Sequence, residues 1–219
     1  MSKEIVVAAY DKDLSWLDKI NDDVVKTVYR KGNEPLNSGE IKMDVNLGRC
    51  VHTFFNHIYT NYDKLADYTF FGQDYPFDHW GNLVEAVNGE IDIEASATLN
   101  IGGYHGFHNN TIGSAWHMPA SLQFGSGNVL TCSSNGSPQD RNPLIDVNKY
   151  WGIIFEGDCP PNYEFIPGGH FTITKEQARL RSRELYKQIC DLLIEDNNAP
   201  WMIERLECYI FNPKYTTKL

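Results

Sequence analysis

The start of the chain has two apolar runs, and the segment between them has apolar residues at helical spacing. Residues 4–10 form a nearly continuous apolar run, which predicts a central parallel strand buried on both faces. Residues 24–29 predict a second strand. The apolar positions between the two predict a short helix that Asp13 or Ser15 caps. This β-α-β order is typical of the start of a nucleotide-binding fold.

The rest of the chain continues the alternation of strands and helices. Residues 33–44 are polar and predict a loop, whereas residues 90–145 have weak periodicity and predict a long irregular insertion. Strands that alternate with helices indicate the α/β class, here as a single domain over residues 1–219. The other expected elements are a helix from Asn46 to about Asn61, a strand at 68–71, a short helix at 82–89, a strand at 150–155, a strand-turn-strand at 164–174, and helices at 174–196 and 200–211.

Composition and charge narrow the possible partners. A net charge of −10 argues against nucleic acid as a partner, and an acidic chain that handles phosphates needs a metal or a few focused basic residues. No apolar run reaches transmembrane length and no signal peptide precedes the first strand, so we expect a cytoplasmic protein without a membrane span. Five cysteines without a CxxC pair indicate neither a zinc site nor a disulfide framework.

The stretch from Leu65 to Trp80 carries the strongest chemical signal. Its first half predicts a buried strand, because it is aromatic and β-branched. Gly72 and Pro76 are expected to end that strand. Ligands of open α/β sheets bind beyond the carboxyl ends of the strands, and manganese accepts carboxylate and imidazole ligands. The alternative is an ordinary turn, in which Asp and Pro are also common. The polar residues beyond the strand are Gln73, Asp74, Asp78 and His79.

Arg49 is the second chemical signal. It lies in the first turn of the expected helix at 46–61, where a cation opposes the helix dipole, which indicates an anion nearby. A surface arginine paired with an acid is the alternative. His105 and His108 form a possible metal pair without an evident third ligand. The chain lacks G-x-G-x-x-G and P-loop sequences, so neither a dinucleotide site nor a P-loop is supported.

Several of these segments together resemble a known family. The chain is similar to small GT-A-type nucleotide-sugar glycosyltransferases with fungal, bacterial and large-virus members, including a virus-encoded enzyme that uses a UDP-sugar and manganese. The resemblance implies a GT-A-like domain whose central, mostly parallel mixed sheet is flanked by helices. It rests on the segments Val6–Leu17, Val28–Gly32, Asn46–Arg49, Asn61–Asp67, Phe77–His79, Pro167–Gly169 and Pro200–Leu206.

The resemblance also implies roles for single residues. Tyr10 and Asp11 would line the nucleoside pocket, and Arg49 would face the diphosphate. Glu204 would be the catalytic acidic residue near the acceptor. The residues implied beside the donor sugar are Gly168, Gly169 and His170, and those implied at the metal are Asp74, Asp78 and His79. The sequence departs from the family's Asp-x-Asp metal motif at this place, because it reads Gln-Asp-Tyr and Asp-His-Trp.

We therefore expect an enzyme that moves a hexose from a UDP-sugar to a glycan or another hydroxyl acceptor, with Mn²⁺ or Mg²⁺ as cofactor. The metal and Arg49 would stabilise the departing diphosphate, and a carboxylate would take the acceptor proton if the reaction inverts. Inversion or retention, the oligomeric state and the identity of the sugar stay open. Two alternatives also stay open: a noncatalytic carbohydrate-binding protein and a metal-dependent phosphate-ester hydrolase.

Overall fold

The computed structural model describes most of the chain. It describes residues 1–32, 35–44, 46–78, 80–90, 147–160 and 170–219, with the backbone alone at Asp78. It also describes the backbone of four short strands. These form two antiparallel pairs, β5 (Phe107–His108) with β6 (Thr111–Ile112) and β7 (Trp116–Pro119) with β8 (Asn162–Phe165).

A five-stranded mixed sheet forms the centre of the molecule, with the strand order β3-β2-β1-β4-β9. Its first four strands are parallel and β9 pairs antiparallel to β4. At the middle of β1, Val7 lies opposite Val28 on one side and Gly72 on the other. The strands are β1 (Lys3–Ala9), β2 (Val24–Arg30), β3 (Ile41–Lys42), β4 (Tyr68–Gln73) and β9 (Phe171–Thr174).

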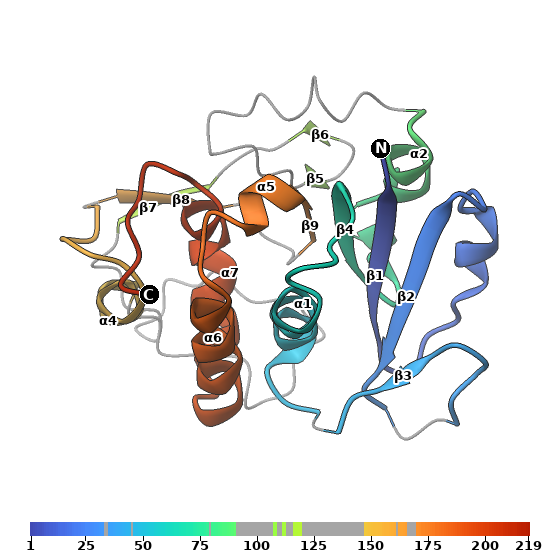
Figure 1. Ribbon diagram of the computed structural model, residues 1–219, viewed down its shortest axis with the longest axis horizontal. Coiled ribbons are helices and arrows are strands. Elements are labelled where there is room, and N and C mark those ends of the chain that lie inside the picture. The colour runs from blue at the N-terminus through green and yellow to red at the C-terminus, as the bar shows by residue number, and fades with distance from the viewer. Residues whose placement is uncertain are drawn as a thin grey trace.

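Helices cover both faces of this sheet. The long helices α1, α6 and α7 lie on one side, with α1 nearest to the sheet (Figure 1). The other face is covered by the short elements that follow β1 and β4. The helices are η1 (Ser15–Lys19), α1 (Arg49–Thr60), η2 (Pro76–Asp78), α2 (Leu83–Asn88), α4 (Val147–Ile154), α5 (Lys175–Ala178), α6 (Arg183–Glu195) and α7 (Ala199–Ile210).

Alternate residues of β1 serve the two faces, because side chains point to opposite sides along a strand. Val6 and Ala8 join the large core with α1, α6 and α7. Ile5 and Val7 join a smaller core with η1 and α2. The continuous apolar run at the start of the chain therefore reflects burial on both faces, as predicted.

The expected α/β class, the central mostly parallel mixed sheet and the flanking helices are confirmed. No helix among the described residues is long and apolar enough to cross a membrane. The expected insertion at 90–145 lies almost entirely outside the described residues.

One predicted strand is wrong. Residues 150–155 belong mostly to α4, whose buried residues Val147, Tyr150, Trp151 and Ile154 follow the helical spacing i, i+3, i+4 and i+7. The dense run of aromatic and β-branched residues suggested a strand because such residues favour strands, but their spacing fits one helical face. Only Phe155 makes a β-bridge, to Thr217.

Several boundaries also differ from the predicted ones. β4 continues through Gly72 to Gln73, and α1 begins at Arg49 with Gly48, rather than Asn46, as its N-cap. The helix expected at 174–196 is two helices, because Ser182 caps α6 by accepting a hydrogen bond from the Leu185 N–H at 3.1 Å. The strand-turn-strand expected at 164–174 is divided between two sheets.

Candidate functional site at the carboxyl edge of the sheet

The strand order creates a topological switch point between β1 and β4. From β1 the chain proceeds to β2 and β3 on one side, then crosses through α1 and returns as β4 on the other side. Loops at such a point diverge, and ligands of open α/β sheets bind there. We call residues 10–12, 30–32 and 73–75, which follow or end β1, β2 and β4, the carboxyl edge.

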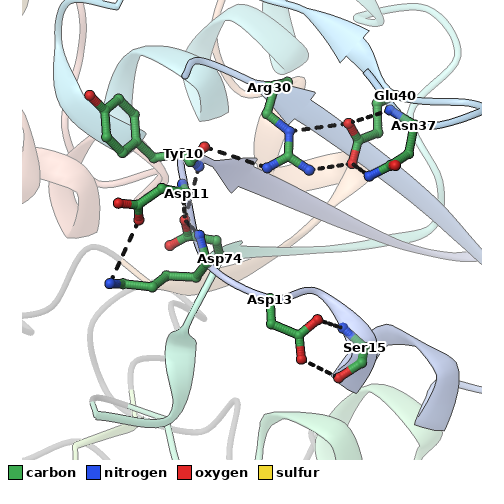
Figure 2. Close-up of polar contacts among 9 residues, drawn as sticks. Tyr10, Asp11, Asp13, Ser15, Arg30, Asn37, Glu40 and Asp74 are labelled. Carbon is green, nitrogen blue, oxygen red and sulfur yellow. Dashed lines mark hydrogen bonds and ion pairs between the residues drawn. The ribbon is translucent and has the colours of Figure 1, made fainter. Parts of the chain in front are cut away.

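The carboxylate of Asp74 binds the loop after β1 (Figure 2). Its Oδ2 accepts hydrogen bonds from the N–H groups of Tyr10, Asp11 and Lys12 at 2.9, 3.2 and 3.1 Å. Its Oδ1 accepts one from the Tyr75 N–H at 3.0 Å. Three successive N–H groups form a concave anion site, which here holds a carboxylate of the same chain. Asp74 thus fixes the ends of two adjacent strands relative to each other.

The Tyr10 backbone is also held from its carbonyl side. Arg30 donates to the Tyr10 carbonyl at 3.4 Å and forms a two-bond ion pair with Glu40 (Figure 2). A Cβ on Gly32 would lie 2.5 Å from the Tyr10 oxygen, so only glycine permits this approach. The Tyr10 ring nevertheless remains 50% exposed. The loop therefore presents exposed side chains on a fixed backbone.

The turn that begins α1 lies beside this loop. Buried Lys31 donates to the carbonyl of Leu47 at 2.6 Å and to that of Arg49. Burial lowers the pKa of the Lys31 ammonium to about 8. Arg49 has a left-handed backbone with φ of 54°, and Gly48 before it has φ of 67°. Non-glycine residues in this region store strain, which clusters at functional sites.

Helix α7 faces the start of α1. The Arg49 guanidinium lies over the Trp201 ring, 4.4 Å from its centroid. Desolvation raises the pKa of the Cys50 thiol to about 11, with the charge of Arg49 opposing the rise and the charge of Glu204 adding to it. The carboxylate of Glu207, a fully buried residue, acts on Cys50 in the same direction as Glu204. Tertiary packing thus brings Arg49 against α7, the helix that carries Glu204.

Two pairs of neighbouring residues connect the start of α1, at Arg49 and Cys50, to the loop after β1. At the end of β2, Arg30 holds Tyr10 while Lys31 holds the turn at Arg49. At the end of β4, Asp74 holds Tyr10 while the Gln73 amide donates to the Cys50 sulfur at 3.4 Å. The carboxyl edge and the α1 turn therefore form one connected polar framework.

The expected metal site is only partly described, because, of its three residues, only Asp74 has a described side chain. No three His, Cys, Asp or Glu residues among them are grouped so that they could hold a metal ion. Both oxygens of Asp74 accept backbone N–H groups, and these donors compete with a metal for the same lone pairs. The side chains of Asp78, His79, His105 and His108 lie outside the described residues.

The donor-sugar residues of the sequence prediction are only partly described. Gly168 and Gly169 lie outside the described residues. His170 is buried just before β9, and its ring carbon Cδ2 would lie 3.8 Å from a Cβ on Gly72. His170 therefore packs beside β4, close to the carboxyl edge.

Sequence reasoning missed four residues of this framework. Arg30 and Lys31 form a basic pair at a strand end, and the sequence gives no sign of the carbonyl groups to which they donate. Glu40 has no sequence signal, because its contact with Arg30 depends on how the following loop folds back. Glu207 lies one turn after Glu204 on a buried helix, a position where carboxylates are rare without a role.

Comparison with known proteins places the chain in a family without assigning an activity. A family model described as protein of unknown function (DUF3431) matches residues 5–217. No curated protein and no solved structure matches the chain. Because the family match extends over nearly the whole described fold, the chain belongs to the DUF3431 family.

Proposed function

We propose that the chain is a glycosyltransferase that moves a hexose from a UDP-sugar to a hydroxyl acceptor such as a glycan. One observation carries the proposal: at the switch point, the backbone of Tyr10 and Asp11 is fixed on both sides while their side chains remain exposed. A fixed loop with exposed side chains suits a ligand that must be held in one orientation. The position at the ends of β1 and β4 suits a nucleotide.

Arg49 supports the diphosphate part of the proposal. Breaking the bond between the sugar and the diphosphate leaves negative charge on the departing phosphate, which a fixed cation stabilises. Lys31 and Trp201 hold Arg49 at the start of α1, where the first backbone N–H groups also favour an anion. The role proposed for Arg49 is to stabilise that charge.

Glu204 supports the acceptor part. It lies on α7, three residues after Trp201, over whose ring the Arg49 guanidinium lies. A carboxylate there suits removal of the proton from the acceptor hydroxyl, a role that corresponds to inversion at the sugar carbon. Manganese remains part of the proposal through the Asp78 and His79 segment of the sequence, and no step of the reaction is assigned to it.

Thermal unfolding with nucleotides tests the proposal. We expect UDP with manganese to raise the melting temperature more than GDP or CMP with manganese, because binding to the folded state alone stabilises it. Equal shifts for the three nucleotides, or none, would remove the UDP-sugar function. Glu204→Gln should keep UDP affinity but lose sugar transfer by at least about a hundredfold.

Thermal unfolding with a free glycan and an assay of phosphate release separate the other two functions. Stabilisation by a free glycan without UDP would favour a noncatalytic carbohydrate-binding protein. Release of phosphate from esters that carry no sugar would favour a hydrolase. Either result, in the absence of a UDP effect, replaces the glycosyltransferase proposal.

A further inference from the structure

We infer that Asp74 is a positioning residue that orders the nucleotide-binding loop, rather than a ligand of the metal. The identity of the nucleotide rests on the proposed function. The ordering role rests on contacts of Asp74 alone and can be tested without any nucleotide.

The first step is the number of backbone groups that Asp74 holds. Its two oxygens accept from four N–H groups, three after β1 and one after β4. The Asp74 carbonyl in addition accepts from the Trp16 indole at 2.8 Å. The side chain and the carbonyl of Asp74 thus connect three segments of the chain: residues 10–12, Trp16 and the turn after β4. Backbone N–H groups thus use most of the roughly four lone-pair sites of the carboxylate.

The second step is what the held segments expose. Tyr10 and Tyr75 are each 50% exposed, and their N–H groups bind different oxygens of the same carboxylate. The Tyr75 ring packs edge-on against Phe77, which packs against Trp16. Asp74 therefore fixes the backbone of two exposed aromatic residues on either side of the switch point. Exposed rings of this kind suit contact with a planar base.

The third step is that Asp74 does not act alone on this loop. The Tyr10 N–H is held by Asp74 and its carbonyl by Arg30, whose ion pair with Glu40 is nearly covered from solvent. Removing Asp74 frees one side of the loop and leaves the other held. Local loosening, rather than unfolding, is the expected consequence.

Three variants separate the two roles of Asp74. Asp74→Ala removes both carboxylate acceptors and keeps the backbone carbonyl that accepts from Trp16. Asp74→Asn keeps one oxygen, which can still accept from the N–H groups of residues 10–12. Asp18→Asn is the matched control, because Asp18 is an exposed carboxylate on the neighbouring η1. A positioning role predicts that Asp74→Asn lies between the parent and Asp74→Ala, whereas a metal ligand role predicts a similar loss in both.

Amide hydrogen exchange at residues 10–12 and 75 is the first measurement. We expect exchange in Asp74→Ala to be faster than in the parent by at least about tenfold, the scale of one lost hydrogen bond to a charged group. Asp74→Asn should show a smaller increase and Asp18→Asn none. Exchange in Asp74→Ala equal to that of the parent overturns the inference, whether or not the protein binds UDP.

Binding of manganese alone, followed by the electron paramagnetic resonance signal of the free ion, is the second measurement. We expect both Asp74 variants to match Asp18→Asn. A loss of manganese binding in both Asp74 variants makes Asp74 a ligand and overturns the inference. UDP affinity should fall by about tenfold in Asp74→Ala and recover in part in Asp74→Asn. A parent protein that binds no UDP refutes the proposed function, and hydrogen exchange still decides the role of Asp74.

Discussion

The loop after β1 at the carboxyl edge and the end of α7 each meet a charged side chain that bonds to several backbone groups. At the edge, partly exposed Asp74 accepts from N–H groups. At the end of α7, buried Arg181 donates to the carbonyls of Ile210 and Asn212, each at 2.6 Å, and of Tyr209 at 3.3 Å. Both side chains satisfy groups that secondary structure leaves unpaired.

The difference in solvent exposure decides what each contact controls. Water can replace the Asp74 carboxylate when the exposed loop opens. Loss of the Asp74 hydrogen bonds therefore mainly reduces the local order of the loop. Water does not reach the carbonyls beside Arg181 without unfolding of the core, so their loss lowers the free energy of unfolding. The loop at the carboxyl edge is therefore suited to binding a ligand, whereas the contacts at the end of α7 stabilise the fold.

The largest effect should come from Arg181. We expect Arg181→Met to lower the free energy of unfolding by about 4 kcal/mol, because it leaves buried carbonyls without donors. Urea unfolding measures this value. Arg183→Met is the control, since Arg183 is exposed and, among the described residues, donates to one carbonyl, that of Tyr59, and pairs with Asp63 at 3.9 Å. Similar losses in the two variants would show that burial of the arginine does not decide how much its hydrogen bonds to carbonyls stabilise the fold.

A second effect should come from the turn that carries Arg49. An Ala at Gly48 would have its Cβ 2.6 Å from the His52 Cβ and 2.9 Å from the Leu193 carbonyl oxygen, with φ of 67°. We expect Gly48→Ala to cost about 3 kcal/mol, from the left-handed backbone and the clash together. Thermal unfolding measures the loss.

Gly157→Ala isolates the backbone part of that cost. Gly157 has φ of 73°, and the part of the chain that the structure describes places no atom within 4 Å of its Cβ position. We expect a loss of about 1 kcal/mol. An equal cost at the two glycines would contradict the tight packing of the α1 turn against α6.

The effect expected from Glu40 is as small as that of Gly157, and it depends on pH. The hydrogen bonds from Arg30 lower the pKa of the Glu40 carboxyl from 4.5 to about 2. Its contribution to stability is therefore complete above about pH 4.5 and is lost as the pH falls through about 2. We expect Glu40→Gln to be less stable than the parent by about 1 kcal/mol at pH 7.

Acid unfolding checks the direction. The difference between parent and Glu40→Gln should narrow as the pH falls from about 4.5 to about 2. A difference that stays constant over this range would mean that the carboxylate of Glu40 does not stabilise the loop through its charge. Exchange at the Tyr10 amide should rise less in this variant than in Asp74→Ala.

The sequence by itself determined the class of fold and the place of the candidate site. The apolar runs that became β1 and β4 are long and buried on both faces, so local composition was sufficient to predict them. Arg49 and Asp74 stood out because each lies where an element begins or ends. The helix α4 was misread because residue preferences and spacing disagreed there, and packing against α7 followed the spacing.

Only the tertiary structure decided what the charged residues contact. Asp74 looked like a metal ligand beside other polar residues, yet its partners are the N–H groups of residues 10–12, more than 60 positions earlier. Glu40 and Arg30 meet because a loop folds back, and Arg49 meets α7 across more than 150 positions. A carboxylate is suited equally to a metal, a cation or a row of N–H groups. The partner is selected when folding brings backbone groups from distant positions of the chain next to the carboxylate. No local pattern in the sequence encodes that contact.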